Sequence, residues 1–267
     1  MSAVVNAVVG AAILLSWLAL VGLSAGAARL AIPAEDAPGN SLLRLLPDVT
    51  LPDWAAQLVA LCAGPAGPGG GVLGFVLLWT MWMLMAVAMM LPSAAPLIRT
   101  YCEIADTAHA KDEAVVHPLV LVAGYLSAWA AASLLFAAIT LFLTNAAAPV
   151  SGVAGAAALG IAGIYQFSNL KKACLEKCRN PFAILFSRWS SRTSRIFRLG
   201  VEQGVWCLGC CWALMLVMFA VGVMNIFWMA LIGLFAIVEK QWDRRLPGSV
   251  AGAILLVWAV ALLVVSR

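Results

Sequence analysis

Five of the seven cysteines stand in two short clusters in the second half of the chain. The first cluster is Cys174-x-x-x-Cys178, and the second is Cys207-x-x-Cys210-Cys211. Residues three or four positions apart share one face of a helix, so each cluster can present its sulfur atoms together. Thiolates are soft ligands that favour Cu(I), zinc or iron–sulfur clusters. The clusters therefore predict a soft-metal site, with Cu(I) as the first expectation and zinc as the alternative.

Methionines repeat at helical spacing in two segments, one of which continues the second cysteine cluster. The two stripes are Met81, Met85 and Met89, and then Cys207, Cys211, Met215 and Met218. A thioether is also a soft ligand, but methionine fills irregular gaps in apolar cores, so packing is the competing interpretation. The full set of predicted metal ligands is Cys174, Cys178, Cys207, Cys210, Cys211, Met85, Met89, Met90 and Met215.

The remaining cysteines and the acidic residues of the apolar segments suggest no further site. Cys62 and Cys102 stand alone, and an isolated cysteine in an apolar helix behaves as a small hydrophobic residue. Glu239 is followed directly by Lys240, and we interpret this pair as a local ion pair at a helix end. No P-loop, H-E-x-x-H or dinucleotide-binding sequence is present, so no enzyme activity is expected from a known motif.

Composition places the chain in a membrane. Hydrophobic residues make up 64% of it and charged residues 10%, whereas soluble domains carry about 25% charged residues. The chain has no basic tail and no aromatic pattern of the kind that nucleic-acid-binding proteins show, so nucleic acid is not an expected partner. We predict an all-α, polytopic transmembrane helical bundle that has the lipid bilayer as its surroundings.

Apolar segments long enough to cross a bilayer, which needs about 20 residues, predict about seven spans. They are residues 4–23, 72–91, 119–143, 153–170, two helices within 204–238, and 248–265. Gly222 to Asn225 is the predicted break inside 204–238, and six spans with one long fifth helix is the alternative. The first 28 residues contain no Lys or Arg, so we expect an uncleaved first span rather than a signal peptide.

Two domains are expected from this organisation. Residues 1–71 would form the first transmembrane helix and an extracytoplasmic loop, with a short interfacial helix near 53–61. Residues 72–267 would form the metal-handling transmembrane domain. Basic residues gather in 92–118, 171–203 and 239–247, and the positive-inside rule assigns these segments to the cytoplasm. All five clustered cysteines would then lie on the cytoplasmic side, where thiols stay free or metal-bound.

Four motifs, in order, resemble a known bacterial family. The first two are Trp79-x-x-Trp82-x-x-Met85-x-x-x-Met89-Met90-Leu91-Pro92-Ser93, and Gly163-Ile164-Tyr165-Gln166 with Lys171-x-x-Cys174-Leu175-x-x-Cys178-Arg179-x-Pro181. The next two are Gly200-x-x-x-Gly204-x-x-Cys207-x-x-Cys210-Cys211-Trp212-Ala213-x-Met215, and Gly222-x-Met224-Asn225-x-x-Trp228-Met229 followed by Glu239-Lys240. They are similar to those of the predicted metal-binding integral membrane proteins. Some members of that family are described as copper chaperones for tyrosinase-type enzymes.

The resemblance implies metal handling in the bacterial inner membrane and delivery to a recipient metalloenzyme or accessory protein. The leading hypothesis is a non-enzymatic copper chaperone or insertion factor, in which sulfur ligands hold Cu(I) and pass it on by ligand exchange. One alternative is a membrane thiol oxidoreductase that cycles a disulfide between two of Cys207, Cys210 and Cys211. The other is a non-catalytic assembly subunit with a structural metal site.

Overall fold

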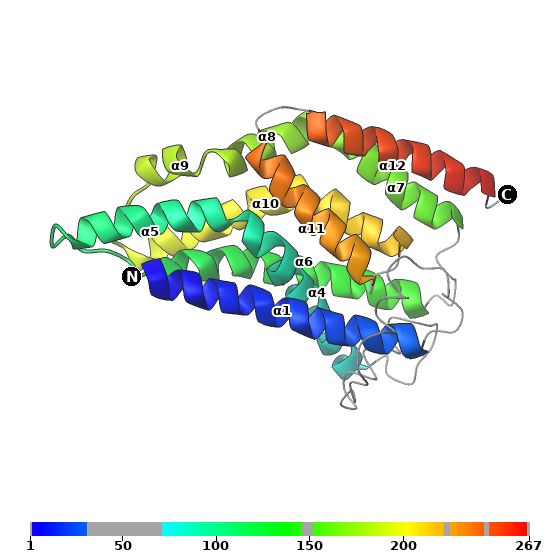
Figure 1. The fold of residues 1–267 in the computed structure, drawn as a ribbon, viewed down its shortest axis with the longest axis horizontal. Coiled ribbons are helices and arrows are strands. Elements are labelled where there is room, and N and C mark those ends of the chain that lie inside the picture. Colours follow the sequence, from blue (N-terminus) through cyan, green and yellow to red (C-terminus); the bar gives the residue numbers. More distant parts are fainter. Residues whose placement is uncertain (1, 31–70, 146–151, 222–224, 243–245, 266–267) are drawn as a thin grey trace.

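Helices make up the regular structure throughout the described part of the chain. The computed structural model describes residues 2–30, 71–145, 152–221, 225–242 and 246–265. Its helices are α1 (Ser2–Leu30), α4 (Val72–Ser93), α5 (Ala95–His109), α6 (Pro118–Asn145), α7 (Gly152–Gln166), α8 (Asn169–Arg179), α9 (Pro181–Ser187), α10 (Thr193–Val221), α11 (Ile226–Gln241) and α12 (Leu246–Val265). They pack side by side in one bundle, with α7 and α12 paired at one edge (Figure 1). The all-α prediction is confirmed for these residues.

Five described helices are long and apolar enough to cross a membrane: α1, α4, α6, α10 and α12. A sixth span results if α7 and α8, which are bent by 64° at a short break, count as one. Seven spans would also require α11, whose 16 residues are about 24 Å long against a hydrocarbon core of about 30 Å. The multi-pass membrane prediction is therefore supported, but the count of seven is not.

The predicted break within 204–238 is matched by the ends of two helices. Helix α10 ends at Val221 and α11 begins at Ile226, while residues 222–224 lie outside the described ranges. Asn225 caps α11, since its side chain accepts hydrogen bonds from the backbone N–H groups of Phe227 and Trp228 at 3.0 and 3.3 Å. Helix α10 starts at residue 193 rather than 204, so its first turns extend the span beyond its apolar part.

The predicted fourth span is shorter than expected because the chain turns after Gln166. The Ser168 side chain accepts a hydrogen bond from the backbone N–H of Lys171 at 3.1 Å and starts α8 as its N-cap. Helix α8 then packs against α10 and α11 instead of continuing along the direction of α7. This turn carries Cys174 and Cys178 towards α10.

Glycines allow the central pair of helices, α6 and α10, to approach closely. A Cβ atom at Gly204 would lie 2.7 Å from the backbone oxygen of Tyr125, and one at Gly200 would overlap the backbone oxygen of Leu121. Small residues are the usual means by which membrane helices bring their backbones together. The short α6–α10 distance places Tyr125 beside the cysteines of α10.

Helix α1 lies along α4 and α5. The Trp17 indole donates a hydrogen bond to the Ala88 carbonyl at 3.0 Å, and the backbone nitrogen of Ser2 lies 3.4 Å from Asp106 Oδ2. The start of α1 therefore shares one end of the bundle with the connector helix α5 (Figure 1). The predicted interfacial helix at 53–61, Cys62 and most of the predicted extracytoplasmic loop fall outside the described residues, so the domain division stays a prediction.

Candidate metal centre

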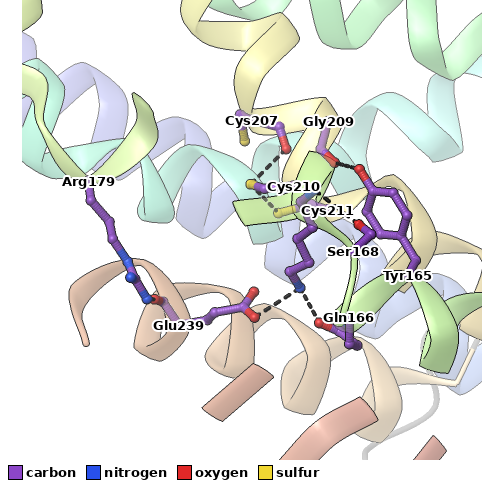
Figure 2. Close-up of polar contacts among 10 residues, drawn as sticks. Tyr165, Gln166, Ser168, Arg179, Cys207, Gly209, Cys210, Cys211 and Glu239 are labelled. Carbon is purple, nitrogen blue, oxygen red and sulfur yellow. Dashed lines mark hydrogen bonds and ion pairs between the residues drawn. The ribbon is translucent and has the colours of Figure 1, made fainter. Parts of the chain in front are cut away.

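Three thiols on one face of α10 form a compact sulfur cluster. The Sγ atoms of Cys207, Cys210 and Cys211 all lie within 4.8 Å of one another. Each residue is 1% exposed, and all three are free thiols. Cys210 Sγ lies 3.3 Å from Cys211 Sγ and 3.1 Å from the Cys207 carbonyl oxygen (Figure 2). Because the spacing of three and four residues covers about one helical turn, the helix itself aligns these sulfurs.

Two polar side chains from other helices contact the first sulfur of this cluster. Lys240, near the end of α11, places its Nζ 3.0 Å from Cys207 Sγ and donates to Ser93 Oγ at 2.7 Å. The Tyr125 hydroxyl of α6 lies 2.9 Å from Cys207 Sγ and donates to the Met90 carbonyl oxygen at 3.0 Å. A buried ammonium at this distance attracts negative charge on the sulfur. Four helices therefore meet at Cys207.

Helix α8 brings the second cysteine pair to the same place. Cys178 packs against the hydrophobic core that contains Cys210. Cys174 Sγ lies against the backbone of Gly209, where an added Cβ would be 2.6 Å away. The Tyr165 hydroxyl donates to the Gly209 carbonyl and fixes the end of α7 against the same turn (Figure 2). Cys174 is buried, whereas Cys178 is partly exposed. The structure thus brings the two cysteine clusters of the sequence into contact.

The predicted methionine ligands are all buried, but what surrounds them is mainly apolar. Met85, Met89, Met90 and Met215 are each at most 2% exposed. Met89 lies over Gly233 of α11, and Met90 contributes its backbone carbonyl to Tyr125. These residues belong to the same hydrophobic core cluster as the three cysteines. Their role as thioether ligands stays a prediction.

A buried charged network lies beside the sulfur cluster. Lys171 of α8 forms an ion pair with Glu239 at 2.9 Å and donates to the Gln166 side-chain oxygen (Figure 2). Arg179 Nη2 donates to the backbone oxygen of Glu239 at 2.7 Å. The predicted local Glu239–Lys240 ion pair is therefore wrong. Consecutive helical residues point in different directions, so Glu239 meets Lys171 while Lys240 turns towards Cys207.

Sequence patterns alone did not identify the polar groups around Cys207. Ser93 and Lys240 fall within the recognised motifs, but the sequence does not show that either lies near Cys207. Tyr125 lies outside all four motifs. A tyrosine in the middle of an apolar helix usually needs a partner for its hydroxyl, and that requirement is the signal that could have drawn attention to it.

Cys102 lies apart from the clustered cysteines. It lies on α5, outside the spanning helices, and is 1% exposed. Burial raises the pKa of its thiol above the ordinary value, with a smaller contribution from the nearby Asp106 carboxylate. It is not part of the described sulfur cluster, and its burial agrees with its interpretation as a small hydrophobic residue.

Comparison with known proteins gives one finding. A family model described as PpoB2, copper chaperone, matches residues 79–262. No curated protein and no solved structure shows a significant match. The matched region covers more than half of the chain and contains every predicted metal ligand named above. The chain therefore belongs to the PpoB2 copper chaperone family.

Proposed function

We propose that the protein binds Cu(I) at the sulfur cluster of α10 and delivers it to a partner metalloenzyme. The observation that carries this proposal is the convergence of Cys207, Cys210 and Cys211 within 4.8 Å in a buried site. Two or three thiolates in an apolar pocket suit a soft monovalent ion, because a hard ligand or water would not compete for it there. The role of the protein would be to bind and transfer copper rather than to catalyse a reaction.

Lys240 supports a copper complex at this position. Two thiolates and one Cu(I) ion carry a net charge of minus one, which is costly in an apolar interior unless a cation lies nearby. The Lys240 ammonium, 3.0 Å from Cys207 Sγ, supplies that cation. The Tyr125 hydroxyl adds a hydrogen-bonding group on the same sulfur.

Transfer would use Cys178 as the exchange ligand. It is the partly exposed thiol of the two cysteine clusters, and it packs against the hydrophobic core that contains Cys210. Copper can move between thiolates when an incoming sulfur binds before an outgoing one leaves. A partly exposed thiol beside buried ones therefore offers a route between the deep site and a partner.

The geometry favours metal binding over the thiol oxidoreductase alternative. Residues three or four apart on a helix have Cβ atoms about 5–6 Å apart, whereas a disulfide needs about 3.5–4.5 Å. Adjacent residues have Cα atoms about 3.8 Å apart, which is below the usual disulfide range of about 4.4–6.8 Å. A disulfide among the three cysteines would therefore require α10 to distort.

We further propose that the site faces the cytoplasm of a bacterium from the inner membrane. The basic segments flank the helix ends that surround the sulfur cluster, as the positive-inside rule requires of cytoplasmic segments. Cys178 is the thiol to test, because it is partly exposed. A membrane-impermeant thiol reagent should label it in inverted membrane vesicles and not in intact cells; labelling in intact cells would reverse the orientation.

Delivery can be tested by metal analysis in cells. Deleting the gene should lower the copper content of the recipient enzyme fraction, and the parent protein should restore it. Cys210→Ser should not restore it, although it should reach the membrane in equal amount. If Cys210→Ser restores copper fully, the cluster does not deliver it. Purified protein that holds zinc tightly and no copper would favour the assembly-subunit alternative.

A further inference from the structure

Two cations of α8 hold the last turn of α11 at a single residue, Glu239. Lys171 Nζ lies 2.9 Å from Glu239 Oε1, and both side chains are 3% exposed. Arg179 Nη2 donates to the Glu239 backbone oxygen at 2.7 Å (Figure 2). Glu239 is among the last four residues of α11, whose carbonyls lack an intrahelical N–H partner, so Arg179 supplies a donor there. These two contacts form the α8 clamp.

Lys171 also contacts the preceding turn of α11. Its Nζ lies 5.8 Å from the centroid of the Phe235 ring, one turn before Glu239, which is within the range of a cation–π interaction. The same ammonium donates to the side-chain oxygen of Gln166, at the end of α7. Because these partners come from α7 and from two successive turns of α11, Lys171 restrains α11 both along its axis and around it.

The residue after Glu239 carries the cation of the sulfur site. Lys240 Nζ donates to Ser93 Oγ at 2.7 Å and lies 3.0 Å from Cys207 Sγ. Lys240 is the second-last residue of α11, and helix ends fray unless other contacts hold them. Since consecutive helical residues are related by a fixed rise and rotation, holding Glu239 also determines where the Lys240 side chain leaves the helix.

Cohesion between α8 and α11 does not by itself require a buried ion pair. Two charges lose their hydration on burial, and apolar residues of similar volume often hold helices together as well or better. The exposed Arg188–Glu202 pair, which joins the end of α9 to α10, keeps most of that hydration. The burial of the Lys171–Glu239 pair one residue away from Lys240 therefore favours a role in placement over a role in cohesion.

We propose that Lys171 and Arg179 are positioning residues, which hold the Lys240 ammonium at Cys207 by way of Glu239. The consequence for copper rests on the function proposed above, whereas the placement of Lys240 requires no copper. Both residues would influence the sulfur cluster only through Lys240. Helix α8 would then serve the site twice, because it also carries Cys174 and Cys178.

The double variant Lys171→Met/Glu239→Gln tests the α8 clamp. It removes both charges together, so no unpaired charge is left in the interior, and it keeps the side-chain lengths. Competition with a Cu(I) chelator on the full-length protein in lipid nanodiscs should show an affinity about tenfold below that of the parent, as for residues that support a ligand. In a Lys240→Met background the same double change should cause no further loss, because the residue through which it acts is gone.

The double variant Arg188→Met/Glu202→Gln is the matched control. It also replaces one ion pair by the same residue types, but this pair joins the end of α9 to α10 rather than α8 to α11. It should keep the parent affinity for Cu(I). Arg179→Met removes the backbone contact and leaves the buried ion pair in place, so it should cause a smaller loss, again only when Lys240 is present.

A measurement on copper-free protein separates this proposal from the copper function. Solid-state NMR between isotope-labelled lysine Nζ and cysteine Cβ atoms should detect a short contact in the parent that is absent in Lys240→Met. The contact should be lost in Lys171→Met/Glu239→Gln and kept in Arg188→Met/Glu202→Gln. If the parent shows the contact but binds no Cu(I), the copper function fails while the placement of Lys240 stands.

The proposal is overturned if folded Lys171→Met/Glu239→Gln protein keeps the Lys240–Cys207 contact or binds Cu(I) as tightly as the parent. An equal loss of affinity with and without Lys240 would also overturn it, since the ion pair would then act on the cluster by another route. If the double variant does not fold, Arg179→Met decides the question: parent affinity in that variant, or a loss that persists in the Lys240→Met background, would contradict the positioning role.

Discussion

The cysteines of α10 and the methionines of α4 make an instructive comparison. Both sets are soft sulfur groups at helical spacing, and both are almost completely buried. They share one hydrophobic core cluster. The cysteines, however, contact polar side chains from α6 and α11, and the cysteine pair of α8 lies beside them. By contrast, Met89 packs over Gly233, and the Met90 backbone oxygen accepts a hydrogen bond from Tyr125.

The difference shows that burial and spacing do not by themselves define a metal site. The cysteines of α10 differ from the methionines of α4 because several helices supply sulfur, a hydroxyl and an ammonium to one point in α10. The contacts described for the α4 methionines are packing over Gly233 and a backbone hydrogen bond from Tyr125. Because a buried charge must be compensated, Lys240 near Cys207 is a stronger indication of function than the sulfur content of either stripe.

Loss of a cluster sulfur should have the largest effect. Cys207→Ser replaces a soft anionic ligand with a hard, protonated hydroxyl. Losing a supporting residue typically lowers metal affinity by about 10–100-fold, so loss of a ligand should exceed about 100-fold. Competition with a Cu(I) chelator measures it. Cys102→Ser is the control, because Cys102 is equally buried on α5, and equal loss in both variants would remove the distinction between the sites.

Removal of the Lys240 charge should have the next largest effect. Lys240→Met keeps the length of the side chain but deletes the cation beside Cys207, and we expect Cu(I) affinity to fall by about 10–100-fold. Lys177→Met, on the exposed face of α8, serves as the matched control. Parent affinity in a folded Lys240→Met protein would show that the charge is not needed to balance the copper complex.

Tyr125→Phe tests the contact that joins the two regions. The substitution deletes one hydroxyl that lies at Cys207 Sγ and at the Met90 carbonyl. A net hydrogen bond of about 1 kcal/mol corresponds to a roughly fivefold loss of Cu(I) affinity. The same chelator competition applies, with Tyr101→Phe as the control, because the Tyr101 hydroxyl donates to Val116 in the connector region instead. A loss as large as that of Cys207→Ser would make Tyr125 a ligand rather than a supporting residue.

Met89→Leu should have the smallest effect. The change conserves volume, so it should cost less than about 1.5 kcal/mol in stability. If Met89 is a packing residue, copper affinity should stay at the parent value in the chelator assay. A loss of Cu(I) affinity comparable with that of Lys240→Met would add the Met89 thioether to the ligand set. The methionines of α4 would then resemble the cysteines of α10 in function.

Sequence patterns were sufficient for the helical membrane fold and for the grouping of the three cysteines on α10. The fold follows because apolar segments of about 20 residues have few alternatives in lipid. The spacing of Cys207, Cys210 and Cys211 fixes their common face once α10 is a helix. Their approach to Cys178 was harder to foresee, because it depends on the turn after Gln166 and on the direction of α8.

The span count and the polar partners were beyond the reach of local patterns. Hydropathy does not show that the chain bends by 64° between α7 and α8 or that α11 has only 16 residues. The partners of Glu239 and Lys240 come from residues far away in sequence, so adjacent charges were wrongly paired. Long-range side-chain contacts of this kind depend on how helices rotate and pack, which one sequence does not specify.

X-ray absorption at the copper edge of the purified, Cu(I)-loaded full chain tests the central claim most directly. The spectrum should show two or three sulfur neighbours and no nitrogen or oxygen neighbour. The double variant Cys210→Ser/Cys211→Ser should lose that sulfur shell, while the single variant Cys102→Ser should keep it. A parent spectrum dominated by nitrogen or oxygen, or an unchanged sulfur shell in the double variant, would contradict the assignment of copper to the cysteines of α10.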